Sequence, residues 1–134
     1  MITADKMRIT NQRRVILNEL IKTKTHPSAD ELYLMVRKTI PNISLGTVYR
    51  NLEILSQTGE ILKLDYGNGQ MRYDGDIKKH YHIYCQKCNR IDDLPEDVIK
   101  NSEYCLEKID NYIIIEFNIY FTGICKNCQV KTNK

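Results

Sequence analysis

The sequence predicts an α+β fold built from two domains, one over residues 1–75 and the other over residues 76–134. The first part carries 11 lysine and arginine residues against 8 acidic ones, whereas the second carries 9 of each. All 5 cysteines lie in the second part. A chain of 134 residues can form one ordinary domain, or two small ones that each need additional stabilisation. Charge and cysteine content together favour a basic module joined to a cysteine-rich module.

Two helices are expected at the start of the N-terminal part. Thr10 is a suitable N-cap for a helix over residues 11–22, where apolar residues recur at helical spacing. Residues 28–31 read Ser-Ala-Asp-Glu, which has the form of a capping box and predicts the start of a second helix. Apolar residues continue at helical spacing until Pro41, where we expect this helix to end.

A third helix and a hairpin are expected to complete the N-terminal part. The third helix should begin at the N-cap Ser44 and end at Gly59. Its short separation from the preceding helix is typical of a helix-turn-helix. Residues 61–64 and 70–73 should then form two strands around Gly-Asn-Gly at 67–69, whose residues tolerate positive φ. We therefore predict an N-terminal winged helix-turn-helix domain.

Two C-x-x-C pairs dominate the C-terminal part. They are Cys85 with Cys88 and Cys125 with Cys128, and 36 residues separate the pairs. Two intervening residues let both thiolates of a pair reach one ion, and four thiolates satisfy tetrahedral Zn(II) with no open position. We predict a structural zinc site. The fifth cysteine, Cys105, falls on the apolar stripe of a helix expected after Pro95, and we interpret it as a small buried hydrophobe.

A run of alternating residues from position 113 to 121 predicts a long strand with one buried face. The opposite face carries Ile114 and Tyr120, so we expect pairing with a second copy and a homodimer. A sheet of this size with one helix buries little apolar surface, whereas apparent zinc-site free energies reach ~10–16 kcal/mol. The expected C-terminal domain is therefore a small α/β dimerisation domain with structural zinc.

The chain shows no signal segment and no apolar run long enough to span a bilayer. An odd number of cysteines argues against a disulfide framework and for metal thiolates in a reducing compartment. We therefore expect a cytoplasmic protein with no membrane partner.

Five motifs, distributed over nearly the whole chain, carry a resemblance to a known family. They are TNQR at 10–13, HPSADELY at 26–33, SLGTVYRNL at 44–52, HYHIYCQKC at 80–88 and GICKNC at 123–128. The chain resembles the ferric uptake regulator (Fur) superfamily of bacterial metal-dependent repressors, and in particular its peroxide-sensing PerR branch. The resemblance implies a winged-helix DNA-binding domain, a dimerisation domain and four cysteines that bind structural zinc.

The resemblance also implies a regulatory Fe(II) or Mn(II) ion held by three histidines and two aspartates. Those positions correspond here to His26, Asp74, His80, His82 and Asp93. Independently of the family, the i and i+2 spacing of His80 and His82 places both side chains on one face of a strand. Nitrogen and carboxylate ligands suit Fe(II) or Mn(II) better than an all-sulfur set would. In PerR-type relatives peroxide oxidises ligating imidazoles, which implies His26 and His80 as the targets.

DNA contacts are expected from the second helix of the helix-turn-helix and from the wing. Tyr49 and Arg50 lie on that helix, which normally enters the major groove. Lys63 and Arg72 lie on the expected wing strands, near the DNA backbone. The further predicted contacts are Arg13, Ser44 and Thr47. The predicted partner is a palindromic double-stranded operator bound by the homodimer.

Three other functions are alternatives to a peroxide-sensing repressor. An iron-responsive or zinc-responsive uptake regulator of the same superfamily is the first alternative, although Asp93 replaces a usual Glu and Asp74 a frequent Cys of those branches. A non-heme metal enzyme could use His80, His82 and a carboxylate as a three-ligand face. No acid/base partner or substrate loop accompanies them, so we predict no enzymatic activity. A zinc-stapled interaction module would leave the basic N-terminal part unexplained.

Overall fold

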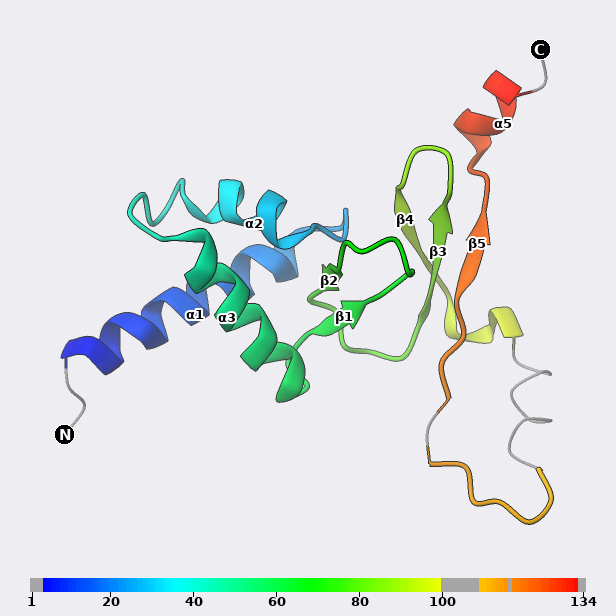
Figure 1. Cartoon of the computed structure of the whole chain (residues 1–134), viewed down its shortest axis with the longest axis horizontal. Coiled ribbons are helices and arrows are strands. Elements are labelled where there is room, and N and C mark those ends of the chain that lie inside the picture. Colours follow the sequence, from blue (N-terminus) through cyan, green and yellow to red (C-terminus); the bar gives the residue numbers. More distant parts are fainter. Residues whose placement is uncertain (1–3, 100–108, 116, 133–134) are drawn as a thin grey trace. The chain divides into compact units, whose positions relative to one another are not determined.

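The computed structural model describes residues 4–99, 109–115 and 117–132. The chain forms two compact units, Met1–Ile77 and Lys78–Lys134 (Figure 1). Cys105 lies outside the described residues, as does most of the helix predicted after Pro95. Among the described helices, none is long and apolar enough to cross a membrane.

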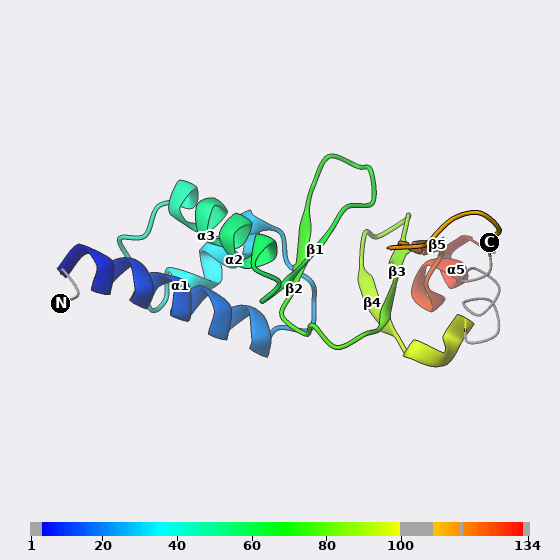
Figure 2. The same cartoon turned by 90° about the horizontal axis from the view of Figure 1, so that it is seen from below.

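The N-terminal unit packs three helices against a two-stranded sheet (Figure 2). The elements follow the order α1 (Ala4–Lys22), α2 (Ala29–Val36), α3 (Leu45–Gln57), β1 (Leu62–Leu64) and β2 (Arg72–Asp74). All three helices bury one apolar face in a common core, which β2 joins through Tyr73. The most deeply buried core side chains are Ile16, Leu20, Leu32, Val36, Val48, Leu52, Leu55 and Ile61. The mixed fold and the winged-helix order of elements confirm the predicted fold class.

Helix starts follow the capping signals at two of the three helices. Ser28 and Glu31 form the predicted capping box, with Ser28 Oγ accepting from Glu31 N and Glu31 Oε1 accepting from Ser28 N at 3.1 Å. Ser44 Oγ accepts from Thr47 N at 3.1 Å and so caps α3 as predicted. The N-cap predicted at Thr10 is wrong, because α1 already begins at Ala4. No proline or glycine interrupts residues 4–9, and an internal threonine costs a helix only ~0.5 kcal/mol.

One of the three helix ends differs from the predicted position. α2 ends at Val36 rather than near Pro41. Thr39 N and Ile40 N both donate to Val36 O at 2.9 Å, so the helix closes in a tightened last turn before the proline. α3 ends at the predicted place, where Gly59 has φ +79°.

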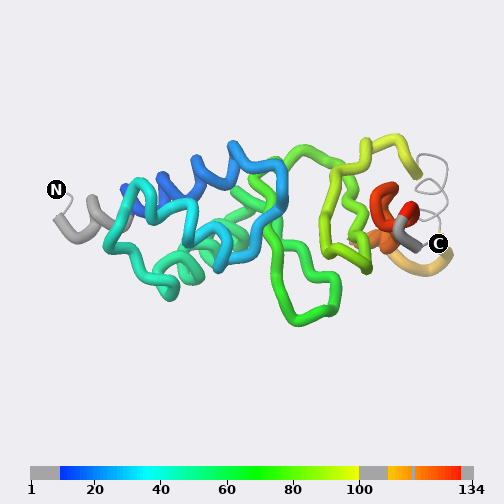
Figure 3. Tube along the Cα trace, turned by 90° about the horizontal axis from the view of Figure 1, so that it is seen from above, coloured from blue at the N-terminus to red at the C-terminus, as the bar shows by residue number. Residues whose placement is uncertain are grey.

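The predicted wing is an antiparallel hairpin whose loop extends away from the helices of its unit (Figure 3). β1 pairs with β2 so that Leu62 faces Asp74 and Leu64 faces Arg72. Gly67 and Gly69 have φ +78° and +82°, as expected for the turn. Gly75 follows β2 and lies so close to α1 that a Cβ atom there would be 2.8 Å from Ile21 Cα.

The C-terminal unit is built on a three-stranded sheet of order β4-β3-β5. β3 (Tyr81–Cys85) pairs antiparallel with β4 (Ile91–Leu94) and parallel with β5 (Phe121–Gly123). A short 3-10 helix, η1 (Glu96–Ile99), follows β4, and α5 (Lys126–Thr132) follows β5.

The long strand predicted over residues 113–121 is wrong for the single chain. Only Phe121 belongs to β5, and the side chains of Ile113 and Ile115 are 92% and 95% exposed. The register gives the reason, because β3 begins at Tyr81 and pairs Ile83 with Phe121. β3 is therefore too short to form hydrogen bonds with most of residues 113–121. An alternating pattern of apolar residues forms a strand only where a partner strand pairs with it.

Candidate metal centres and nucleic-acid interface

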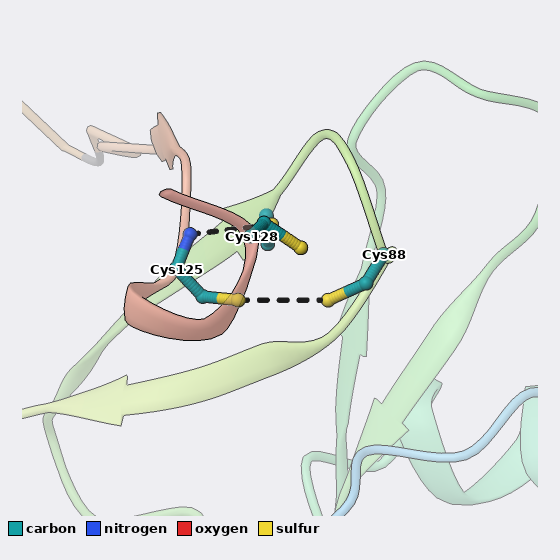
Figure 4. A group of neighbouring side chains, drawn as sticks. Cys88, Cys125 and Cys128 are labelled. Atoms are coloured by element: carbon teal, nitrogen blue, oxygen red, sulfur yellow. Dashed lines mark hydrogen bonds between the residues drawn. The ribbon is translucent and has the colours of Figure 1, made fainter. Parts of the chain in front are cut away.

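The first candidate site is a cluster of four thiols in the C-terminal unit. Cys85 ends β3, Cys88 lies in the following turn, Cys125 precedes α5 and Cys128 lies in its first turn. The four sulfur atoms lie within 4.8 Å of one another. Cys88 Sγ and Cys125 Sγ are 3.8 Å apart (Figure 4).

Parallel pairing of β3 with β5 is what brings the two C-x-x-C turns together. Cys85 pairs with Gly123 in this ladder, and Gln86 N donates to Gly123 O at 3.0 Å. The chain then reverses after Cys85, where Asn89 N donates to Cys85 O at 2.8 Å and Asn89 adopts φ +65°. The sheet therefore aligns two turns that are far apart in sequence.

The thiols differ strongly in acidity. Backbone N–H groups of Cys125 and Cys88 point at the Cys85 sulfur and lower the pKa of that thiol to about 6. A hydrogen bond to Cys125 raises the pKa of the Cys128 thiol to about 12. Four sulfur atoms this close together can all be deprotonated only beside a compensating cation. The all-sulfur donor set, its compactness and its lack of an open position fit tetrahedral Zn(II).

Each unit also holds a separate group of imidazole and carboxylate side chains, and the group in the N-terminal unit is a buried histidine–aspartate pair. His26 Nε2 lies 3.3 Å from Asp74 Oδ2, and the two residues are only 2% and 5% exposed. Asp74 is the last residue of β2, and His26 lies in the segment between α1 and α2. His26 has φ +56°, a left-handed conformation that is rare outside glycine.

The corresponding group in the C-terminal unit contains His80, His82 and Asp93. The Nε2 atoms of the two imidazoles are 3.1 Å apart, and each lies 3.3 Å from Asp93 Oδ1. The β3–β4 register pairs His82 with Asp93, which explains why the carboxylate reaches both rings. Two ring nitrogens and one carboxylate oxygen thus converge, a mixed donor set that suits Fe(II) or Mn(II).

The predicted DNA-contacting residues on α3 form one exposed surface. Tyr49 is 48% exposed, and Arg50 is exposed beside it. Arg50 Nη2 donates to Thr47 Oγ1 at 3.2 Å, and Thr47 Oγ1 lies 2.8 Å from Ser44 Oγ. The hydroxyls at the start of α3 therefore orient the arginine. Lys63 on β1 is exposed and forms an ion pair with Glu53 of α3 at 2.9 Å.

Arg13 and Arg72 have other environments. Arg13 Nε donates to Asn51 Oδ1 at 3.0 Å, so this α1 residue is tied to the buried side of α3. Arg72 is only 9% exposed, and its guanidinium donates to the carbonyl oxygens of Thr25, at 3.2 Å, and His26. A side chain held there is not available to a DNA backbone, so the predicted DNA contact of Arg72 is corrected to an internal role.

Sequence reasoning missed two polar residues of α3 that contact the predicted DNA-binding side chains. Asn51 is buried on α3, and its Nδ2 donates to Thr47 O at 2.8 Å while its Oδ1 accepts from Arg13. Glu53 joins α3 to the wing through Lys63. Asn51 could have been found from the sequence, because it is a polar residue at an inward-facing position of an amphipathic helix. The contact of Glu53 joins two different elements and leaves no local sequence pattern.

Comparisons with known proteins agree on one family. The model of the ferric uptake regulator family matches residues 4–122. The peroxide-responsive repressor PerR of Staphylococcus aureus (strain USA300) is 36% identical over 125 residues, which cover 93% of this chain and 84% of the relative. The crystal structure of a Campylobacter jejuni peroxide stress regulator superposes with a TM-score of 0.80 at 35% identity, covering 92% of this chain and 93% of that one. The ferric uptake regulator Fur of Helicobacter pylori, described as having three functional metal binding sites, gives a TM-score of 0.79 at 26% identity, covering 93% and 90%.

Proposed function

The chain belongs to the ferric uptake regulator family, and we propose that it is a metal-dependent transcriptional repressor that leaves its operator in response to hydrogen peroxide. The proposed DNA-binding domain is residues 1–75, and the proposed dimerisation domain is residues 76–134. We place the protein in the cytoplasm, where a reducing environment keeps zinc thiolates intact.

One observation carries the proposal, namely that mixed nitrogen and carboxylate donors gather in both units. His26 and Asp74 supply one imidazole and one carboxylate at 3.3 Å. His80, His82 and Asp93 supply two further imidazoles and a carboxylate, again at 3.3 Å. We propose that all five residues hold one regulatory ion in the DNA-binding state. Because the ligands come from both units, binding of the ion favours one arrangement of the units over others.

Fe(II) or Mn(II) is the proposed regulatory ion, and bound Fe(II) would supply the single electron that splits hydrogen peroxide into hydroxide and a hydroxyl radical. The proposed targets of the oxidant are the imidazoles of His26 and His80. An oxygen atom added to either ring removes one nitrogen donor from the five proposed ligands. Binding of the ion then no longer favours the DNA-binding arrangement of the units. A coupling free energy of ~1–3 kcal/mol already changes operator affinity about 5–150-fold.

Structural Zn(II) is proposed at Cys85, Cys88, Cys125 and Cys128. The zinc would hold the β3 turn to the start of α5, since each element contributes one C-x-x-C pair. A homodimer is proposed because the apolar run before β5 is exposed in the single chain. Its exposed members are Tyr112, Ile113, Ile115, Phe117 and Tyr120.

Two copies related by a two-fold axis would read two half-sites, so the proposed operator is palindromic. Tyr49 and Arg50 are placed for contacts to base edges or phosphates, with Ser44, Thr47 and Lys63 beside them. Arg13 would act through Asn51 by orienting α3.

The deciding experiment measures operator affinity by fluorescence anisotropy for protein loaded with zinc plus either Fe(II) or Mn(II), before and after brief peroxide treatment. We expect both metals to support binding, and only the iron form to lose it on oxidation. Peptide mass spectrometry of the same samples should place the added oxygen on His26 or His80. Oxygen confined to the four clustered cysteines, with both imidazoles intact, would refute the proposed sensor.

Equal sensitivity of the iron and manganese forms would instead favour an iron-responsive uptake regulator. Tight operator binding with Zn(II) as the only added metal would favour a zinc-responsive one. Turnover of a substrate by the iron-loaded protein, without any effect of metal on operator affinity, would favour the non-heme enzyme.

A further inference from the structure

Three consecutive residues of β2 hold the segment that carries His26. Arg72 donates from its guanidinium to the carbonyl oxygens of Thr25, at 3.2 Å, and His26. Tyr73 N donates to Pro27 O at 3.0 Å. Asp74 Oδ2 lies 3.3 Å from His26 Nε2. β2 therefore contacts the backbone of residues 25–27 and also the side chain of His26.

The backbone of His26 needs such support. A non-glycine residue in the left-handed region costs ~1–2 kcal/mol relative to the right-handed one. His26 has φ +56°, and it precedes Pro27, which restricts its backbone further. Strained residues of this kind persist only where their surroundings over-determine them. The guanidinium of Arg72 supplies this support. Its N–H groups donate hydrogen bonds to two successive backbone carbonyl groups, and the side chain is buried.

We propose that Arg72 is the positioning residue of the regulatory metal site, and that it acts by holding His26 in the left-handed conformation that directs its imidazole toward Asp74. The inference rests on the proposed function, since it takes His26 and Asp74 as ligands. It assigns to Arg72 a role in metal affinity in place of a DNA contact. Groups that orient metal ligands from behind typically change metal affinity by about 10–100-fold when they are replaced.

The arrangement also has a mechanical consequence for the wing. β2 pairs with β1 through the whole register from Leu62↔Asp74 to Leu64↔Arg72. A change in the His26 segment therefore reaches a wing strand through Arg72 without any intervening residue.

The test measures Mn(II) affinity of the full-length, zinc-loaded protein from the electron paramagnetic resonance signal of free Mn(II). Arg72→Met keeps much of the side-chain volume and removes all donors, and we expect it to weaken Mn(II) binding at least about tenfold. Arg72→Lys retains one charged donor group without the fork, so its loss should be smaller. In metal-free protein, the backbone chemical shifts of His26 should leave their left-handed values in Arg72→Met and be partly restored in Arg72→Lys.

Two control variants separate this role from general destabilisation. Leu55→Ala removes a buried core side chain of the same unit, and its folded form should bind Mn(II) with wild-type affinity. His26→Ala removes a proposed ligand and should weaken Mn(II) binding at least as much as Arg72→Met does.

Each outcome decides one question. Wild-type Mn(II) affinity in Arg72→Met, with His26→Ala impaired, would overturn the inference and leave the proposed function standing. Equal losses in Arg72→Met and Leu55→Ala would also overturn it, because they would reveal only a structural role. Wild-type affinity in His26→Ala would overturn the proposed ligand set itself. If Arg72→Met does not fold, Arg72→Lys must show both weakened Mn(II) binding and shifted His26 resonances, and the absence of either would reject the inference.

Discussion

Among the described residues, the N-terminal unit has an extensive apolar core, whereas the C-terminal unit buries few apolar side chains. In the N-terminal unit, residues from α1, α2, α3 and β2 pack into one cluster that includes Ile16, Leu32 and Leu52, all fully buried. Among the described residues of the C-terminal unit, the buried apolar side chains are Tyr81, Cys85 and Ile91.

Exposed apolar residues show the reverse distribution. The described part of the C-terminal unit exposes Val98, Ile109, Tyr112, Ile113, Ile115, Phe117, Tyr120 and Val130. A unit whose described residues bury so little apolar surface is stabilised by a metal, a partner or both. We infer that the N-terminal unit is stabilised by its own core, and that the C-terminal unit depends on its cysteine cluster and on a second copy of the chain.

Zinc removal should have the largest effect on stability, and it should affect the C-terminal unit but not the N-terminal unit. Cys125→Ser or a strong chelator is expected to unfold the C-terminal unit, because structural zinc contributes an apparent ~10–16 kcal/mol in small domains. The N-terminal unit should keep its structure. Hydrogen exchange resolved by mass spectrometry can follow both units in one sample. Loss of protection in both units together would contradict the proposed independence, and full protection of β3 and β5 without zinc would contradict the proposed role of the metal.

Shortening a buried core side chain should destabilise the N-terminal unit. Leu52→Ala is expected to lower the free energy of unfolding of the N-terminal unit by ~2–5 kcal/mol, since Leu52 is fully buried. Its matched control, Leu34→Ala, changes a side chain that is 61% exposed and should stay within ~0.5 kcal/mol of wild type. Urea denaturation provides the free energies, and bound zinc should be unchanged in both variants. A Leu52→Ala protein that loses zinc would mean that the units do not fold separately.

Gly75→Ala should have an intermediate effect. The added Cβ would lie 2.8 Å from Ile21 Cα and 2.9 Å from Ile21 N, so β2 must move away from the α1 backbone. Overpacking of this kind costs ~1–3 kcal/mol. Thermal unfolding measures the loss, and Gly46→Ala is the matched control, because its added Cβ meets no atom closer than Ser44 Oγ at 4.0 Å. If Gly75→Ala costs no more than Gly46→Ala, the close approach to α1 is not what requires glycine.

The smallest effect is expected from the surface ion pair between the wing and α3. The hydrogen bond and charge of Lys63 hold the pKa of Glu53 below its usual value of 4.5. A depressed carboxyl pKa stabilises the folded state above the unfolded pKa, and this contribution disappears as pH falls through the folded pKa. Wild type should therefore lose slightly more stability than Glu53→Gln between neutral pH and pH values below 4.5. Denaturant titrations across this range would expose the difference, and identical pH profiles would show that the pair contributes nothing to folding.

Local signals explain which parts of the fold were predictable. The capping box at Ser28 and the cap at Ser44 each act within three residues, and both appear in the structure. Gly67 and Gly69 adopt the positive φ that their turn requires. Each C-x-x-C spacing sets two thiols in one turn, whereas the pairing of β3 with β5 brings the two turns together. His82 lies on β3 and His80 directly precedes it, so the i, i+2 spacing groups the two imidazoles and the β3–β4 pairing adds Asp93.

The sequence by itself determined the N-caps of α2 and α3, the turns, the cysteine pairs and the residues that resemble the family motifs, because each depends on neighbours close along the chain. Tertiary structure alone decided three other features. Arg72 turned inward because carbonyl groups 46 positions earlier needed a buried donor, a contact that has no local signature. Arg13 met Asn51 across two helices for the same reason. The alternating run at 113–121 remained largely outside the sheet because β3 is too short to pair with it, and a strand forms only where another strand supplies its hydrogen bonds.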